Sequence, residues 1–278
     1  MSGMGYGTDQ NYGANQNYRY KEPFDKQKIS MVRHRAEKLL FVISIIGTLG
    51  IGALLFHFDR EKLFMFAAVV FFMIYSLHAR TRAYAIKVSE RNFPEIYHKS
   101  VEFAYMLGMK TVPAVYIEQQ NGALNAFAAA VVGKRYTGIN AEIVDVAYTG
   151  DKDFDPVFYV LAHEFAHHYF GHTHIIQVFV NYFGGFIPVT GMAHSRAREY
   201  SCDRLAQLLM EKDCAREAML LCAGRRLYNV VDLNDYIDQA STERGPFLWF
   251  TNMLATHPIP LKRIAALADP SRRSGKLF

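Results

Sequence analysis

Two stretches decide how the central part of this chain folds: L-A-H-E-F-A-H-H at residues 161–168 and S-R-A-R-E-Y-S-C-D at residues 195–203. In an α-helix, residues four positions apart lie on one face. His163 and His167 can therefore offer two imidazole nitrogens to one metal ion, with Glu164 beside them. The first stretch thus predicts a helix with a metal-binding face.

The residues around the first stretch support this helix. Asp155 suits an N-cap, Pro156 suits the first helical position, and apolar residues recur at helical spacing toward Phe170. We expect further helices at residues 196–210 and 211–229. Before the first stretch, three β-prone runs separated by turn residues predict a small sheet. These runs are V-P-A-V-Y-I-E (112–118), N-A-F-A-A-A-V-V (125–132) and I-N-A-E-I-V-D-V (139–146).

A hydrolytic zinc site usually has three protein ligands and leaves a fourth position for water. His163 and His167 supply two ligands, and Glu164 is placed to act as general base. A carboxylate or a histidine must supply the third ligand, and Glu199 in the second stretch is the best candidate. His172 is the alternative if the first helix ends early or distorts. The pattern therefore predicts Zn²⁺ as the cofactor.

Asp203 follows Glu199 by one helical turn and so lies on the same face. There it can accept the ring N–H of a zinc-binding histidine, which fixes the nitrogen that faces the metal. The alternative is an exposed salt bridge to Arg196, Arg198 or Arg204. His168 projects about 100° around the helix from His167, so we expect it on the surface or beside a ligand.

Two apolar runs precede these stretches. Residues 39–58 and 63–79 contain no Asp, Glu, Lys or Arg, and their lengths suit a bilayer core. The turn Asp59–Lys62 is charge-balanced, whereas Lys26, Lys28, Arg33, Arg35, Lys38, Arg80, Arg82, Lys87 and Arg91 lie outside the two runs. The positive-inside rule then puts both ends in the cytoplasm. A transmembrane helical hairpin is predicted over residues 37–80. A pair of buried core helices would not explain the basic flanks.

The remaining segments complete the expected organisation. Residues 1–36 are expected to be a disordered cytoplasmic tail, because the first twenty are rich in Gly, Tyr, Asn and Gln. Residues 81–278 form the metal-binding domain. Within it, residues 175–192 are apolar but interrupted, for example by Pro188. They are either a bent linker against the domain or at the membrane interface, or a third membrane contact.

Composition narrows the class of partner. The net charge of +5 is largely accounted for by the flanks of the apolar runs, so nucleic-acid binding is not indicated. Cys202, Cys214 and Cys222 lack zinc-ribbon spacing and suit reduced thiols in the cytoplasm. No signal peptide is expected, because a mostly polar segment precedes the first apolar run. Together the patterns predict an α+β protein, with a transmembrane hairpin and a mainly helical, zincin-like domain that contains a small β-sheet.

Four motifs resemble the membrane-bound zinc endopeptidases of the HtpX heat-shock protease type, with the CAAX prenyl proteases as more distant relatives. They are L-N-A-F-A (124–128), the two stretches quoted above, and T-H-P-I-P-L-K-R-I (256–264). The resemblance covers about residues 104–267. It implies that Glu199 is the third zinc ligand and that Asp203 supports the site. It also implies that Asn125, Ala126 and Phe127 belong to an edge strand that binds extended substrate.

The last motif supplies two further candidates. The resemblance places His257 and Arg263 near the site, where His257 could donate to the oxyanion of the reaction and Arg263 could brace the zinc helix through a carboxylate. Alternatively, both residues only fasten the C-terminal segment. Two departures from the family are visible. Cys202 stands where the family usually has Ala, and residues 175–192 are long enough for only one of the two further spans common in HtpX-like proteins.

The resemblance implies an integral membrane zinc metalloendopeptidase of the inner membrane, multi-pass, with its catalytic domain facing the cytoplasm. Its partners would be the lipid bilayer and polypeptide substrates, namely membrane or membrane-proximal proteins handled in quality control. The alternatives are a processing protease with few targets and a non-catalytic zinc-bearing interaction protein. The sequence does not indicate an oligomeric state.

Overall fold

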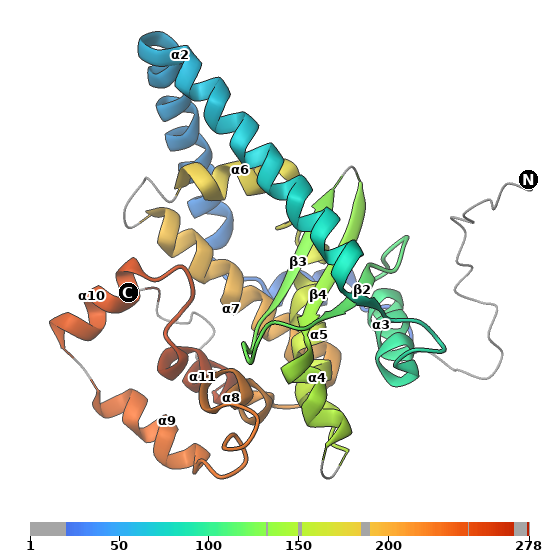
Figure 1. Ribbon diagram of the computed structural model, residues 1–278. Coiled ribbons are helices and arrows are strands. Elements are labelled where there is room, and N and C mark those ends of the chain that lie inside the picture. The colour runs from blue at the N-terminus through green and yellow to red at the C-terminus, as the bar shows by residue number, and fades with distance from the viewer. Residues whose placement is uncertain are drawn as a thin grey trace, which may run out of the picture.

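The computed structural model describes residues 21–131, 133–149, 152–184, 190–243, 245–269 and 277. Its elements in chain order are α1 (Lys26–Val32), α2 (Glu37–Tyr84), β1 (Ile86–Lys87), α3 (Pro94–Met106), β2 (Ala114–Glu118), β3 (Ala126–Val131), β4 (Lys134–Asn140), α4 (Ala141–Tyr148), α5 (Asp155–Tyr169), α6 (Ile175–Gly184), α7 (Thr190–Met210), α8 (Ala215–Ala223), α9 (Leu233–Thr242), α10 (Pro246–Leu254) and α11 (Pro260–Ala268). Helices predominate around a small mixed sheet (Figure 1), which confirms the predicted α+β class.

Helix α2 projects from the rest of the molecule as two legs joined at a tip (Figure 1). Helical geometry breaks at Asp59, where φ is −156° and ψ is 68°. Lys62 stabilises the turn, since its backbone N–H lies 3.1 Å and its ammonium 2.6 Å from the Asp59 carboxylate. The two predicted apolar runs occupy the two legs. Within the described residues, α2 is the one helix long and apolar enough to cross a membrane, and its transmembrane role stays a prediction.

The sheet has the strand order β1-β2-β4-β3. Strand β2 is parallel to β4, whereas β1 and β3 each run antiparallel to their neighbour. Strand β3 is therefore an edge strand. Gly138 of β4 pairs with Phe127 of β3, and a Cβ at Gly138 would lie 2.4 Å from the Phe127 ring. The ring thus packs flat over β4 only because residue 138 lacks a side chain.

One predicted strand is wrong. We expected residues 139–146 to be extended, but the strand is β4, which ends at Asn140, and residues 141–148 form helix α4. The apolar residues of the run fit both the two-residue period of a strand and the 3.6-residue period of a helix. Four of them are buried on one helical face: Ile143, Val144, Val146 and Ala147. Gly133 was expected to begin a turn without a strand of its own. Its φ is +76°, and the residues that follow it form β4.

Helix α5 occupies the centre of the hydrophobic core. It packs against α3, α4, α7 and α8 and against β3 and β4 (Figure 1). Ala162, Phe165 and Ala166 have no exposed surface (0%). The prediction of a helix over residues 155–170 is confirmed, although Phe154 takes the cap position and Asp155 the first helical one. The core thus holds the polar face of α5 rigidly.

The expected N-terminal tail is ordered in part. Residues 1–20 lie outside the described residues. Residues 26–32 form α1, whose N-cap Asp25 accepts the backbone N–H of Gln27. Ile29 is 1% exposed, and the Phe24 N–H bonds to the Met106 carbonyl at 2.8 Å. The expectation of disorder over residues 1–36 is therefore wrong for this part, because one buried isoleucine and a backbone bond attach it to the domain.

The apolar segment 175–192 is described as helix α6 and, from Thr190, as the first residues of α7, while residues 185–189 lie outside the described residues. Helix α6 packs against α2 and α7. Val180 is 4% exposed, and Gln177 bonds to His194 of α7 at 3.3 Å. Ile175 and Ile176 remain exposed at 46% and 56%. The described helix thus contacts both the domain and the foot of α2.

Candidate metal centre

Helices α5 and α7 bring three donor atoms together. His163 Nε2 and His167 Nε2 are 3.2 Å apart; one Glu199 oxygen, Oε2, lies 3.3 Å from His163 Nε2, and the other, Oε1, lies 3.4 Å from His167 Nε2. Ligands about 2.0–2.1 Å from a tetrahedral zinc ion are separated by about 3.3–3.4 Å. All three residues are buried, at 6%, 9% and 5% exposure. The donor set and its spacing thus fit Zn²⁺.

Glu164 lies in α5 directly beside these donors and lines the same cleft. Burial raises the pKa of Glu164 to about 7, and the Glu199 carboxylate adds to this rise, whereas His163 and Arg263 oppose it. A carboxyl group with a pKa near neutrality can accept a proton and release it again at neutral pH. The geometry therefore suits Glu164 to general acid–base chemistry.

Asp203 and Arg263 hold the ring of His163 from behind. His163 Nδ1 lies 2.9 Å from an Asp203 oxygen, which also accepts the Tyr159 hydroxyl at 2.8 Å. Arg263 binds both Asp203 oxygens, at 2.8 and 2.6 Å. An Nδ1–H that donates to a carboxylate leaves Nε2 free to face a metal. The bond expected from Asp203 to a histidine ring is present, and its arginine partner is Arg263 from α11.

His172 lies on the other side of His167. Its Nδ1 is 3.0 Å from His167 Nδ1, the ring nitrogen opposite the one that faces Glu199. It therefore cannot join His163 around one ion without displacing the His167 ring. With His167 and Cys202 it forms a second group that could hold a metal. Burial raises the pKa of the Cys202 thiol well above its usual value, and a protonated thiol is a poor ligand.

A buried carboxylate from outside the domain supports His172. Glu37, the first residue of α2, lies 3.0 Å from His172 Nε2 and has no exposed surface (0%). It also accepts bonds from Arg33 and from the Ser201 hydroxyl. Burial alone would raise the pKa of Glu37, but His172 and Arg33 lower it to about 2. Glu37 is thus an ionised group inside the protein.

His168 and His174 belong to neither group. His168 is buried rather than on the surface, at 1% exposure, and lies within 3.2 Å of the Thr137 hydroxyl and 3.3 Å of the Thr173 hydroxyl. His174 is exposed, and its Nδ1 accepts the Ile176 N–H at the start of α6. Neither histidine faces the donor atoms of His163.

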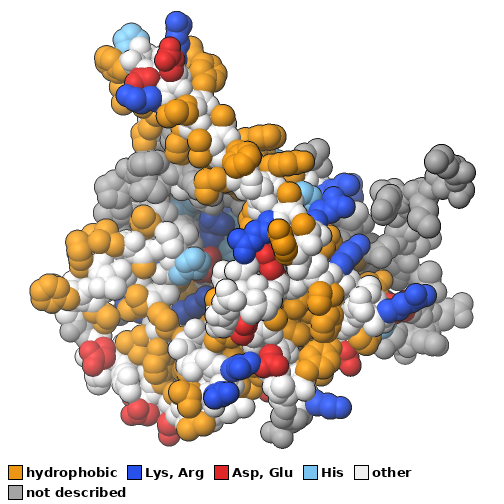
Figure 2. Space-filling view, in the orientation of Figure 1, with side chains coloured by type: hydrophobic (Ala, Val, Ile, Leu, Met, Phe, Trp, Pro, Cys, Tyr) orange, Lys and Arg blue, Asp and Glu red, His pale blue; other side chains and the backbone are white. Residues whose placement is uncertain are grey.

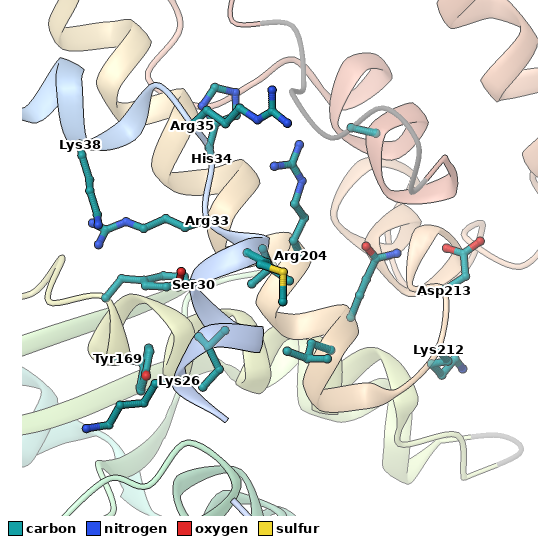
Figure 3. Close-up of a pocket in the computed structure, with 17 residues that line it drawn as sticks. Lys26, Ser30, Arg33, His34, Arg35, Lys38, Tyr169, Arg204, Lys212 and Asp213 are labelled. Carbon is teal, nitrogen blue, oxygen red and sulfur yellow. The ribbon is translucent and has the colours of Figure 1, made fainter. Parts of the chain in front are cut away.

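The donors open into a cleft of about 350 Å³, and β3 forms one wall of it. Asn125, Ala126 and Phe127 line this wall. Ala126 and Phe127 belong to the edge strand β3, whereas Asn125 immediately precedes it, and substrate binding along this strand stays a prediction. His257, from the loop between α10 and α11, also lines the cleft. Its side chain is 66% exposed, and its Nε2 is 3.9 Å from Glu199. A larger cavity of about 1020 Å³ lies at the foot of α2, away from these donors (Figure 3).

The comparison with known families bears on this site. Residues 173–271 match the model of peptidase family M48. The match supports a metallopeptidase of that family, whose members are typically zinc-dependent. No curated protein and no solved structure matches the chain.

The M48 match covers one half of the candidate site. It includes Glu199, Asp203, His257 and Arg263 and begins after His167. The α5 half of the metal centre therefore rests on the motif and on the geometry. Together the two halves give a donor set that could hold a metal in an M48-type peptidase.

Sequence reasoning missed Glu37, Arg33 and Ser201, although all three belong to the network behind His167. Arg33 was assigned to the basic flank of an apolar run, because a charged residue next to such a run is usually solvated. Glu37 is separated from His172 by 135 positions, and no local pattern connects them. The available signal was an acidic residue alone within a basic flank.

Proposed function

We propose that this protein is a zinc-dependent endopeptidase of the HtpX type, anchored in a membrane by α2. One observation carries the proposal: three donor side chains, His163, His167 and Glu199, approach one another at distances close to those between zinc ligands and lie beside Glu164, in a cleft bordered by an edge strand. The M48 match over residues 173–271 supports it independently.

His163, His167 and Glu199 would hold the ion, which when bound polarises water and the substrate carbonyl. Glu164 accepts the proton of the attacking water and delivers it to the departing amine. Asp203 keeps the His163 ring in the orientation that binding requires. His257 projects into the cleft within 3.9 Å of Glu199, where its ring N–H can donate to the oxyanion that forms during attack.

The edge strand suggests the form of the substrate. A polypeptide in extended conformation can add itself to an edge strand through main-chain hydrogen bonds, which depend little on sequence. Strand β3 lies at the sheet edge and lines the cleft through Ala126 and Phe127, and Asn125, just before the strand, also lines it. Unfolded or damaged polypeptides meet this requirement, since folded chains rarely expose an extended segment. This supports a role in protein quality control.

The surface of α2 supports a position in the membrane. Hydrophobic side chains cover the projecting hairpin and charged ones gather at its tip (Figure 2). Phe64, Phe71 and Phe72 are 63%, 64% and 69% exposed, which is unfavourable in water for so long a helix. At the foot of the hairpin, Lys26, Arg33, Arg35 and Lys38 line the large cavity (Figure 3). Basic residues at this end favour a cytoplasmic domain at the inner membrane.

Cleavage of casein by the purified full chain in detergent tests the function. The wild-type protein should degrade casein to many fragments, and a zinc chelator should stop this until Zn²⁺ is restored. A wild-type protein that binds zinc but leaves casein and membrane-protein substrates intact would refute the endopeptidase. Cleavage confined to one captured target, identified by trapping on Glu164→Gln, would replace quality control with specific processing.

A further inference from the structure

We propose that Glu37 and His172 are positioning residues for the metal ligand His167 and that they tie the metal centre to the foot of α2. The three residues, Glu37, His172 and His167, are called the histidine relay below. The inference rests on the proposed zinc centre and adds to it the partner that orients its second histidine.

The contacts of the relay are short and enclosed. His167 Nδ1 lies 3.0 Å from His172 Nδ1, and His172 Nε2 lies 3.0 Å from Glu37 Oε1. His172 and Glu37 are 3% and 0% exposed, so water does not compete for these bonds. The Glu37 carboxylate also accepts hydrogen bonds from the Arg33 guanidinium and the Ser201 hydroxyl. Each group in the relay therefore has a fixed partner.

The positions of the protons follow from the metal centre. A histidine that binds zinc through Nε2 carries its proton on Nδ1 and must donate it. For His167, the acceptor at that nitrogen is His172 Nδ1. An imidazole that accepts at Nδ1 is protonated at Nε2, and His172 Nε2 points to the Glu37 carboxylate. One arrangement of protons thus satisfies both bonds, and it leaves His167 Nε2 facing the donors of His163 and Glu199.

Each of the two metal-binding histidines is linked to a buried carboxylate, one directly and the other through a second histidine. His163 donates directly to Asp203, which Arg263 holds. His167 reaches its carboxylate through an intervening imidazole, and that carboxylate is held by Arg33. The direct support comes from α7 and α11, whereas the relay ends on the first residue of α2. The orientation of His167 therefore depends on where the foot of α2 is seated.

Zinc affinity of the full chain in detergent micelles, measured by competition with a chromophoric chelator, tests the relay. Support groups of this kind are worth about 10–100-fold in metal affinity. We expect His172→Phe, which keeps a ring of similar size but removes the acceptor, to weaken zinc binding by that amount. Glu37→Gln should weaken it less, about tenfold. The visible spectrum of the Co²⁺-loaded protein should change in both variants, since the geometry at His167 changes.

His168→Phe is the matched control. His168 is equally buried and adjacent to His167, but its ring contacts Thr137 and Thr173. It should leave zinc affinity and the Co²⁺ spectrum unchanged. If His168→Phe weakens zinc as much as His172→Phe, the effect is general loss of packing and the relay is overturned.

A double variant separates a relay from two independent effects. If Glu37 acts through His172, then Glu37→Gln combined with His172→Phe should bind zinc as His172→Phe alone does. Losses that multiply, or single variants that keep the wild-type zinc affinity, would overturn the proposal. Circular dichroism of each metal-free variant identifies any that fails to fold, and the milder Glu37→Gln then carries the test. None of these readouts depends on proteolysis, so failure of the proposed function would appear separately, as zinc binding without cleavage.

Discussion

Replacing Arg263 by Met should destabilise the protein severely, because it leaves the Asp203 carboxylate buried without its cation. Arg263 makes two charge-assisted bonds to Asp203, of 2.8 and 2.6 Å, and the Asp203 side chain is only 3% exposed. Breaking a buried ion pair by removing one partner costs about 3–5 kcal/mol. Two bonds to charged groups at about 1.5–3 kcal/mol each give a similar figure. Met preserves the apolar part of the side chain, so little of the loss is due to packing.

Thermal unfolding of the metal-free protein measures this cost without a contribution from zinc. For a domain of this size, about 3–5 kcal/mol corresponds to a fall in Tm of roughly 10 °C. Arg225→Met is the matched control, because Arg225 pairs with Asp145 on the surface, with side chains 43% and 39% exposed. A pair so exposed contributes under about 1 kcal/mol. Equal Tm losses in the two variants would refute the reasoning from burial.

Four further outcomes are expected. Glu164→Gln should keep about one zinc per chain by metal analysis while casein cleavage falls by about a hundredfold or more, and cleavage near the wild-type rate would mean that another base operates. Glu199→Ala should lose zinc and activity together, and retained zinc would transfer the third-ligand role elsewhere. His257→Ala should lower kcat with KM and bound zinc little changed, whereas full activity would leave it only a fastening role. Gly138→Ala should destabilise by about 1–3 kcal/mol, because its Cβ would stand 2.4 Å from the Phe127 ring, and adding Phe127→Ala should recover much of the Tm; no recovery would place the strain elsewhere.

Local patterns predicted the parts of this protein that local physics determines. The spacing of His163 and His167 needs only one helix. The apolar residues of α5 repeat at helical spacing, and its first turn contains residues that favour a helix start, so both signals predict the same helix. The apolar runs of α2 were found for the same reason. Strand β4 and helix α4 were misassigned, since a run that alternates and also repeats every three or four residues satisfies both periods, and only packing selects between them.

Long-range contacts required the structure. Arg263 was placed near the site by resemblance, but its bonds to Asp203 join positions 60 residues apart. Glu37 was not anticipated at all, because nothing near it in sequence suggests a buried histidine as its partner. A carboxylate normally avoids the protein interior, and its burial is favourable here only because Arg33, Ser201 and His172 converge on it after folding.

The position of Glu37 also limits the distance between the membrane and the metal centre. On the proposed topology the bilayer begins within a turn of this residue, and from its carboxylate to the metal-facing nitrogen of His167 there are two 3.0 Å contacts and two imidazole rings. The metal-facing nitrogen therefore lies no more than about 10 Å from Glu37, a distance that roughly three extended residues span. Because the rings are held at both ends, the distance is fixed rather than set by a flexible tether. On that topology, the protein would cleave membrane-anchored polypeptides within a few residues of the membrane face and would leave peptide bonds farther from the membrane intact.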